Sequence, residues 1–306
     1  MNNRSIFVLM ITRLIFCCFL FSSVIVYAED GQDVSIKAKL KQLVVLRQAV
    51  LDAENDDVRV QANAEFLMFM RDALNHPKSF VTEFDTIPMI ADLRSGDGYF
   101  RMINWNLPYD DQTNRYFCFV QYFDKKENIH KVIELKRGYR DLEDEYRKIF
   151  SEKDWYGALY YKIIPSKASG RKKRKRAYML LGWDGQDQYS SLKVIDVMSI
   201  TKRGLKFGAD IFDYPYESKI KRFIIKYKAD ASVFMNYDKQ KKRIVFNHLV
   251  PMQPDLEGLY EFYIPVLEFD AFEWKRRKWV FVEDVELKAG SKDRIYNDPP
   301  EDQNLR

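Results

Sequence analysis

The chain has 306 residues, of which 46% are hydrophobic, 15% aromatic and 31% charged, and its formal net charge at pH 7 is +5. A chain of this length can bury a core for one large domain or two small ones. The near balance of acidic and basic residues excludes the class of proteins that bind nucleic acid or membranes through bulk positive charge.

The first 28 residues have the order of parts that is typical of a secretory signal peptide. Arg4 and Arg13 are basic, Leu14 to Val26 is an apolar run, and small residues end at Ala28, before Glu29. The run is shorter than the ~20 residues of a membrane-spanning helix, so we expect cleavage after Ala28 rather than a retained anchor. The sequence therefore predicts an exported protein without a transmembrane anchor after processing.

Cleavage at this point lowers the net charge from +5 to +3 and removes Cys17 and Cys18. The remaining Cys118 lies in an apolar, strand-like run at 116–120. We expect a buried, unreactive thiol there, because apolar surroundings disfavour the thiolate. With one cysteine the exported chain has no internal disulfide and depends on its core for stability.

Residues 29–77 are predicted to form a helical hairpin. Apolar residues recur at helical spacing in two stripes, and the second helix is expected to begin near Asp56-Asp57, which are good N-terminal capping residues. Pro77 ends it, since proline cannot continue a helical hydrogen-bond ladder. The two stripes are Ile36, Leu40, Leu43, Val44, Val50 and Leu51, and then Val58, Ala62, Phe66, Phe69, Met70 and Ala73.

Residues 78–296 are predicted to form a mainly antiparallel β domain, interrupted by a helix near 138–152. Short alternating or apolar segments separated by turn residues indicate successive strands. The expected strands are 79–84, 99–105, 116–123, 131–135, 156–164, 177–183, 192–200, 223–228, 233–237, 243–249 and 279–286. The fold class is therefore α+β, with a helical hairpin followed by a β-meander, and the pattern leaves a barrel, a sandwich and a propeller-like arrangement open. The polar, proline-broken end at 297–306 is predicted to be a disordered tail.

Several segments of the β domain resemble a group of exported envelope proteins of Bacteroidota to which no activity is assigned. The resemblance covers roughly 97–288, and it implies a Gram-negative envelope setting but no functional residue. Within that setting we expect a periplasmic protein, or alternatively a secreted or cell-surface one. It is carried by DWYGALYYKII at 154–164 and YMLLGWDG at 178–185, and continues through 222–224, 244–249 and 279–284.

Catalytic, metal-binding and cofactor motifs are not recognisable in the sequence, and no cofactor is expected. His76, His130 and His248 lack the spacing of a metal site, and we expect structural or surface roles for them. No G-x-S-x-G nucleophile motif occurs.

Two groups of carboxylates, Asp110-Asp111 and Asp184 with Asp187, could offer oxygen ligands to Ca²⁺. They lack the regular spacing of a dedicated calcium loop, so no metal site is predicted. A pair of acids from separate strands, as in a glycosidase, leaves no local signature and stays open.

One cluster of like charge stands out, a run of six basic residues in the connection between two strands. It consists of Arg171, Lys172, Lys173, Arg174, Lys175 and Arg176. Such a run is either a solvated loop or a flexible site for anionic envelope polymers, and it is our candidate binding site.

The function predicted from the sequence is binding: a non-enzymatic envelope protein that holds a partner protein or a glycan on a β surface. The alternative is a hydrolase that cleaves polysaccharide or peptidoglycan through paired carboxylates. A concave groove with two carboxylates favours the hydrolase, whereas a flat aromatic patch favours binding.

Overall fold

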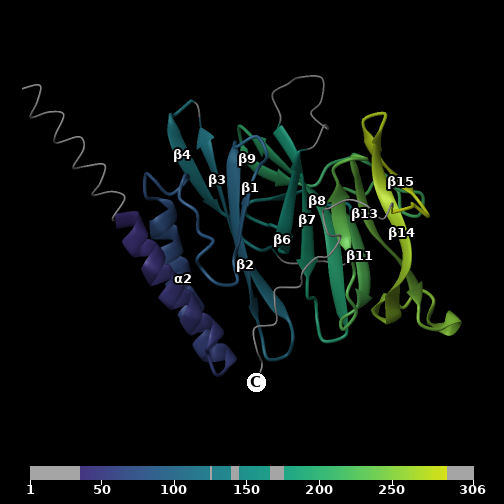
Figure 1. Cartoon of the computed structure of the whole chain (residues 1–306), viewed down its shortest axis with the longest axis horizontal. Coiled ribbons are helices and arrows are strands. Elements are labelled where there is room, and N and C mark those ends of the chain that lie inside the picture. Colours follow the sequence, from purple (N-terminus) through teal and green to yellow (C-terminus); the bar gives the residue numbers. More distant parts are fainter. Residues whose placement is uncertain (1–34, 125, 139–144, 166–175, 288–306) are drawn as a thin grey trace, which may run out of the picture. The chain divides into compact units, whose positions relative to one another are not determined.

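The structure is a computed structural model that describes residues 35–124, 126–138, 145–165 and 176–287 (Figure 1). The predicted signal peptide at 1–28 and the tail at 297–306 lie outside the described residues. The chain divides into two compact units, Met1–Met89 with Lys126–Val132, and Ile90–Lys125 with Ile133–Arg306. A pair of N-terminal helices precedes mostly antiparallel sheets, which confirms the α+β class.

The first unit contains the predicted helical pair, α1 at 35–51 and α2 (Asp56–Leu74). The N-cap of α2 is Asn55, whose side chain accepts a hydrogen bond from the amide of Val58 at 3.1 Å. The expected capping residues Asp56-Asp57 lie in the first turn instead, where their negative charges interact favourably with the positive N-terminal end of the helix dipole. The predicted stripe is confirmed at its centre, where Phe66 and Met70 are fully buried.

The strand predicted at 79–84 is wrong, because this segment winds through successive turns. The Ser79 hydroxyl donates to the carbonyl of Leu74 at 2.7 Å, and the Thr82 hydroxyl donates to the carbonyl of Lys78 at 2.8 Å. Side-chain bonds of this kind offer the backbone an alternative to a sheet ladder. The apolar residue that suggested a strand, Phe84, is nevertheless buried.

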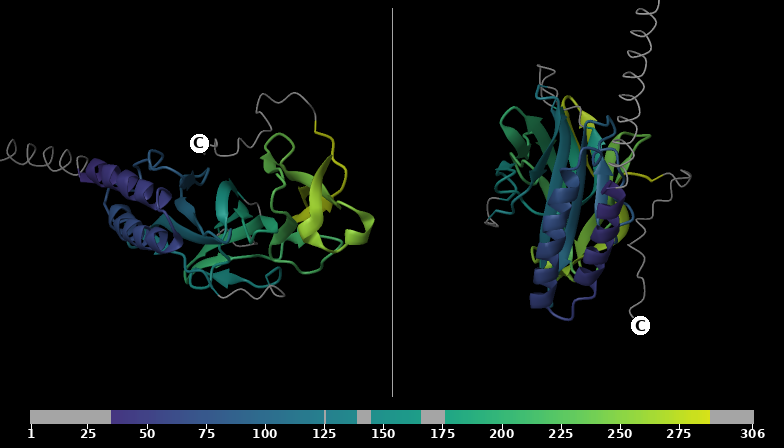
Figure 2. Two further views of the ribbon diagram at one scale, coloured as in Figure 1. Left: turned by 90° about the horizontal axis from the view of Figure 1, so that it is seen from below. Right: turned by 90° about the vertical axis from the view of Figure 1, so that its left-hand side faces the viewer.

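The described strands form three sheets (Figures 1 and 2). The first has the order β1 (Ala91–Arg94), β2 (Phe100–Pro108), β3 (Asn114–Asp124), β4 (Ile129–Glu134). The second has the order β5 (Phe150–Ser151), β9 (Gly204–Phe207), β8 (Ser190–Thr201), β7 (Arg176–Asp184), β6 (Leu159–Pro165), and β11 (Phe223–Lys228) also pairs with β8. The third has the order β10 (Phe212–Asp213), β15 (Lys278–Val282), β14 (Tyr263–Lys275), β13 (Arg243–Pro251), β12 (Met235–Asp238). Two short 3-10 helices, η1 (Pro254–Leu256) and η2 (Tyr260–Phe262), connect β13 to β14.

The second sheet is the middle layer of the second unit, because both of its faces are buried. Along β7, Tyr178 and Leu180 belong to a core shared with β2 and β3, whereas Met179 and Leu181 belong to a core shared with β13 and β14. Successive residues of a strand point to opposite faces, so one strand serves two cores. The sheets are therefore stacked in layers, as in a sandwich with one extra layer.

Ten of the eleven predicted strands are present, most of them within a few residues of the expected bounds, and the structure adds β1, β5, β9, β10 and β14.

Cys118 is a buried free thiol, as expected, and burial raises its pKa well above the ordinary value. No helix in the described ranges combines the length and the apolar character that a membrane crossing would require.

The helix predicted near 138–152 is not formed where the structure describes it. Residues 145–147 make a turn and Phe150 begins β5, while 139–144 lie outside the described residues. The carbonyl of Tyr146 accepts from the amide of Lys221 at 2.6 Å, and that of Lys148 accepts from the Arg222 guanidinium at 2.9 Å. Bonds to a distant segment thus replace the helical ladder, although the apolar spacing is helical.

A buried ion pair fixes this segment against the middle sheet. Arg222 Nε lies 3.4 Å from Asp196 Oδ1, and both side chains are fully buried. The guanidinium also donates to the carbonyls of Glu145, Lys148 and Phe207, the last at 3.2 Å. The other carboxylate oxygen of Asp196 accepts from the Tyr160 hydroxyl at 3.2 Å. A charge buried this deeply is tolerated because it has these partners.

Candidate functional site: an aromatic cavity

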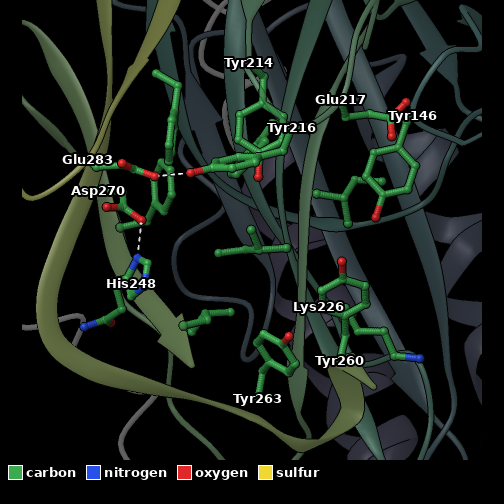
Figure 3. A pocket seen from close by; sticks show the side chains of 17 residues that line it. Tyr146, Tyr214, Tyr216, Glu217, Lys226, His248, Tyr260, Tyr263, Asp270 and Glu283 are labelled. Carbon is green, nitrogen blue, oxygen red and sulfur yellow. Dashed lines mark hydrogen bonds and ion pairs between the residues drawn. The ribbon is translucent and has the colours of Figure 1, made fainter. Parts of the chain in front are cut away.

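The second unit contains a cavity of about 310 Å³, which we call the aromatic cavity (Figure 3). Eight of its seventeen lining residues are aromatic. They are Tyr146, Tyr214, Tyr216, Phe223, Phe246, Tyr260, Tyr263 and Phe281. The volume lies at the lower end of the range for small-ligand pockets, so one or two sugar-sized groups would fill it.

The aromatic side chains run from a buried floor to an exposed rim. Phe223 on β11 and Phe246 on β13 are each 2% exposed, and their ring centroids are 5.1 Å apart. Tyr216 and Tyr260, by contrast, are 65% and 54% exposed. The buried phenylalanines thus form the floor of the cavity, whereas the rings of the rim tyrosines are exposed to solvent.

The positions of Tyr214 and Tyr216 depend on a parallel strand pair that directly precedes them. β10 pairs in parallel with β15, with Phe212 opposite Trp279, whereas β12, β13, β14 and β15 of the same sheet pair antiparallel. The chain then continues past Tyr214, whose ring is perpendicular to that of Phe281 with 5.1 Å between the ring centroids. The hydroxyl of Tyr216 donates to Glu283. This pairing therefore places two tyrosines from the middle of the chain beside its last described strand.

Two carboxylates lie next to each other on one wall of the cavity (Figure 3). The pairing of β14 with β15 ends at Ala271 and Val282. Asp270 precedes Ala271 on β14, and Glu283 follows Val282 in the bend after β15. The two acids come from different parts of the chain and meet on one wall, an arrangement that no local pattern in the sequence contains.

Asp270 is held by a histidine. Its Oδ2 lies 2.8 Å from Nδ1 of His248, and its Oδ1 accepts from the amide of Asp284 at 3.3 Å. The Asp270 side chain is 8% exposed and that of His248 is 39% exposed. The pairing of β13 with β14 shifts register between Asn247 and Leu249, and this bulge sets the position of His248.

Three phenols of the cavity are held in their protonated form. Burial, followed by the neighbouring Tyr260 and two glutamates, raises the pKa of Tyr146 to about 12. Burial first, and then nearby groups that include Asp270, raise the pKa of Tyr214. At the exposed rim, the hydrogen bond to Glu283 is the first cause that raises the pKa of Tyr216. These three tyrosines are therefore neutral hydrogen-bond donors at physiological pH.

The basic run proposed as a binding site is not among the residues that line the aromatic cavity. Its residues 171–175 lie outside the described residues, and Arg176 is the first residue of β7, opposite Ile200. The prediction for this run therefore stays a prediction.

Two of the three histidines have the structural positions that we expected. His76 Nδ1 accepts from the amide of Lys78 at 3.2 Å, and His130 stacks on Phe80 with 4.4 Å between ring centroids. His248 differs, because it lines the aromatic cavity and pairs with a carboxylate.

The candidate calcium ligands stabilise turns. Asp111 accepts from the amide and the hydroxyl of Thr113 at 2.9 and 2.7 Å, and Asp187 accepts from the amide of Ser190 at 2.8 Å. Within the described ranges no cluster of three or more His, Cys, Asp or Glu side chains could hold a metal ion.

No protein-family model, curated protein or solved structure matches this chain. The resemblance to exported envelope proteins therefore stays an expectation from the sequence. The chemistry of the aromatic cavity has to be argued from its own residues.

Proposed function

We propose that the protein is a non-enzymatic binding protein of the cell envelope, and that the aromatic cavity holds a short glycan or one sugar unit of a longer one. The observation that carries this proposal is the combination of eight aromatic rings with a fixed pair of carboxylates in one small cavity. Aromatic faces pack against the apolar faces of sugar rings, while carboxylates and phenols exchange hydrogen bonds with sugar hydroxyls.

Three features favour binding over catalysis. Asp270 and Glu283 lie on the same wall, whereas the two acids of a glycosidase flank the scissile bond. Each acid also accepts a hydrogen bond from a side chain, Asp270 with His248 and Glu283 with Tyr216. None of the seventeen lining residues is Ser, Thr or Cys, so the described cavity wall offers none of these nucleophiles.

A hydrolase acting on polysaccharide or peptidoglycan remains the second candidate, because one observation favours it. A carboxylate at Nδ1 of a half-exposed histidine is the arrangement that orients a general base. The other ring nitrogen of His248 would then activate a water molecule.

Calorimetric titration with short oligosaccharides tests the binding proposal. We expect Tyr216→Ala and Tyr260→Ala to weaken binding about two- to tenfold each, which corresponds to about 0.5–1.5 kcal/mol for an aromatic contact. Tyr189→Ala is the matched control, since Tyr189 is 66% exposed and lies outside the cavity lining. Equal effects of all three variants would refute the site.

Product analysis by chromatography separates the two functions. Binding without cleavage after long incubation supports the first proposal. Cleavage that disappears in His248→Ala supports the hydrolase.

A further inference from the structure

The charges of the aromatic cavity indicate which kind of sugar it would take. Its lining contains three carboxylates, Glu217, Asp270 and Glu283, but Lys226 is its only lysine or arginine. Glu217 pairs with Arg147, and Lys226 lies 3.8 Å from Glu261, so partners outside the lining compensate both.

The uncompensated charge is concentrated on the wall that carries Asp270 and Glu283. Glu283 accepts from the neutral hydroxyl of Tyr216, and Asp270 is paired with His248, which carries charge only when protonated. Neighbouring carboxylates repel each other, and a cation placed between them lowers this repulsion. The wall is therefore suited to a positively charged group.

The aromatic rings favour the same kind of ligand. The face of an aromatic ring carries partial negative charge and attracts an ammonium group within about 6 Å of its centroid. Tyr214, Tyr216 and Tyr263 line the same cavity as the carboxylate pair (Figure 3). Tyr214 and Tyr216 are neutral, so they add hydrogen-bond donors and ring faces to the cavity without adding charge.

We propose, on the basis of the proposed glycan-binding function, that the aromatic cavity selects an amino sugar with a free, protonated amine over its N-acetylated or neutral counterpart. The ammonium group binds at the carboxylate pair of Asp270 and Glu283, and the sugar ring packs on the tyrosines. The proposal requires no chemical step, and the two carboxylates act as ligands for the ammonium group.

The decisive experiment compares two oligosaccharides of equal length, a glucosamine oligomer and its fully N-acetylated form, by calorimetric titration. A mildly acidic buffer of low salt keeps the amines protonated. We expect the glucosamine oligomer to bind at least tenfold more tightly, and we expect added salt to weaken it far more than the N-acetylated form.

Three variants assign the effect to the wall. Glu283→Gln should reduce the preference for the amine at least fivefold, and it is the main reporter because its partner Tyr216 stays neutral in acid. Asp270→Asn should act in the same direction, although His248 can compensate part of its charge. Asp230→Asn is the control, since this acid is 72% exposed, outside the cavity and paired only with Lys228 on the surface. Thermal melting of each variant confirms folding, and Glu283→Gln alone suffices if Asp270→Asn unfolds.

The outcomes separate this inference from the function on which it rests. If neither oligosaccharide binds, the glycan-binding function itself is wrong. If both bind equally, or if the preference survives Glu283→Gln, the function stands and the selection of a cationic sugar is refuted.

Discussion

The buried pair of Asp196 and Arg222 should control the stability of the second unit. Replacement of Asp196 by Asn keeps the shape of the side chain but leaves the guanidinium of Arg222 without a counter-charge in a fully buried position. Removal of one partner from such a pair typically costs about 3–5 kcal/mol, because an uncompensated charge stays behind. Since domains are stable by about 5–15 kcal/mol, this variant should come close to unfolding.

Removal of the other partner should cost at least as much. Arg222→Met leaves the Asp196 carboxylate without its cation and also frees three carbonyls, those of Glu145, Lys148 and Phe207. Each lost hydrogen bond adds about 1 kcal/mol. In the double variant neither charge remains, so its cost should be at least about 2 kcal/mol smaller than the sum of the two single costs.

Urea unfolding of the purified protein, followed by tryptophan fluorescence, measures these energies. Trp155 is a suitable reporter, because its indole donates to Tyr160, which in turn donates to Asp196. Asp230→Asn, which breaks an exposed pair, should leave the stability almost unchanged and serves as the control. A cost below 1 kcal/mol for Asp196→Asn, or strictly additive single costs, would refute this account of the buried charge.

Three further outcomes are expected. Burial lowers the pKa of Lys193 to about 8 from 10.5. Folding stability should therefore rise with pH between these values, where the unfolded chain binds more protons than the folded one. Lys193→Met should be about 1–3 kcal/mol more stable than the wild type at pH 7, and equal stability of both proteins in urea titrations at several pH values would contradict this. Arg276 and Arg277 both have positive φ, at 49° and 68°, so replacing them with Asn-Gly should raise the midpoint of thermal unfolding, and an unchanged or lower midpoint would speak against strain in this turn. Cys118 should react with a thiol reagent only in denaturant, a result that rapid labelling of the native protein would overturn.

Much of the architecture follows from short-range patterns. The helical stripes and most of the expected strands lie within a few residues of where periodicity and turn residues place them. The longest missed strand, β14 (Tyr263–Lys275), contains Pro265, which normally argues against a strand. Its hairpin to β15 turns through Arg276-Arg277 instead of an Asn-Gly signal, so the connection was not recognisable either.

The aromatic cavity could not be found in the same way, for a physical reason. Its walls come from residue 146 at one end to residue 283 at the other, and they meet only through pairing of distant strands. The sequence contains Tyr214-Pro215-Tyr216 and His248, but it does not reveal which residues lie next to them in the folded chain. The carboxylate pair of Asp270 and Glu283 depended on β14, the strand that the sequence patterns did not reveal.

The parallel pairing of β10 with β15 has a consequence for the time at which the cavity comes into being. Phe212 and Asp213 pair with Trp279 and Val280. The tyrosines that follow β10 can therefore be positioned only after residues 279 and 280 have been synthesised. A nascent or truncated chain that ends before residue 278 lacks Phe281, Glu283 and the strand that positions Tyr214. Such a fragment would therefore be unable to bind the ligand proposed for the cavity.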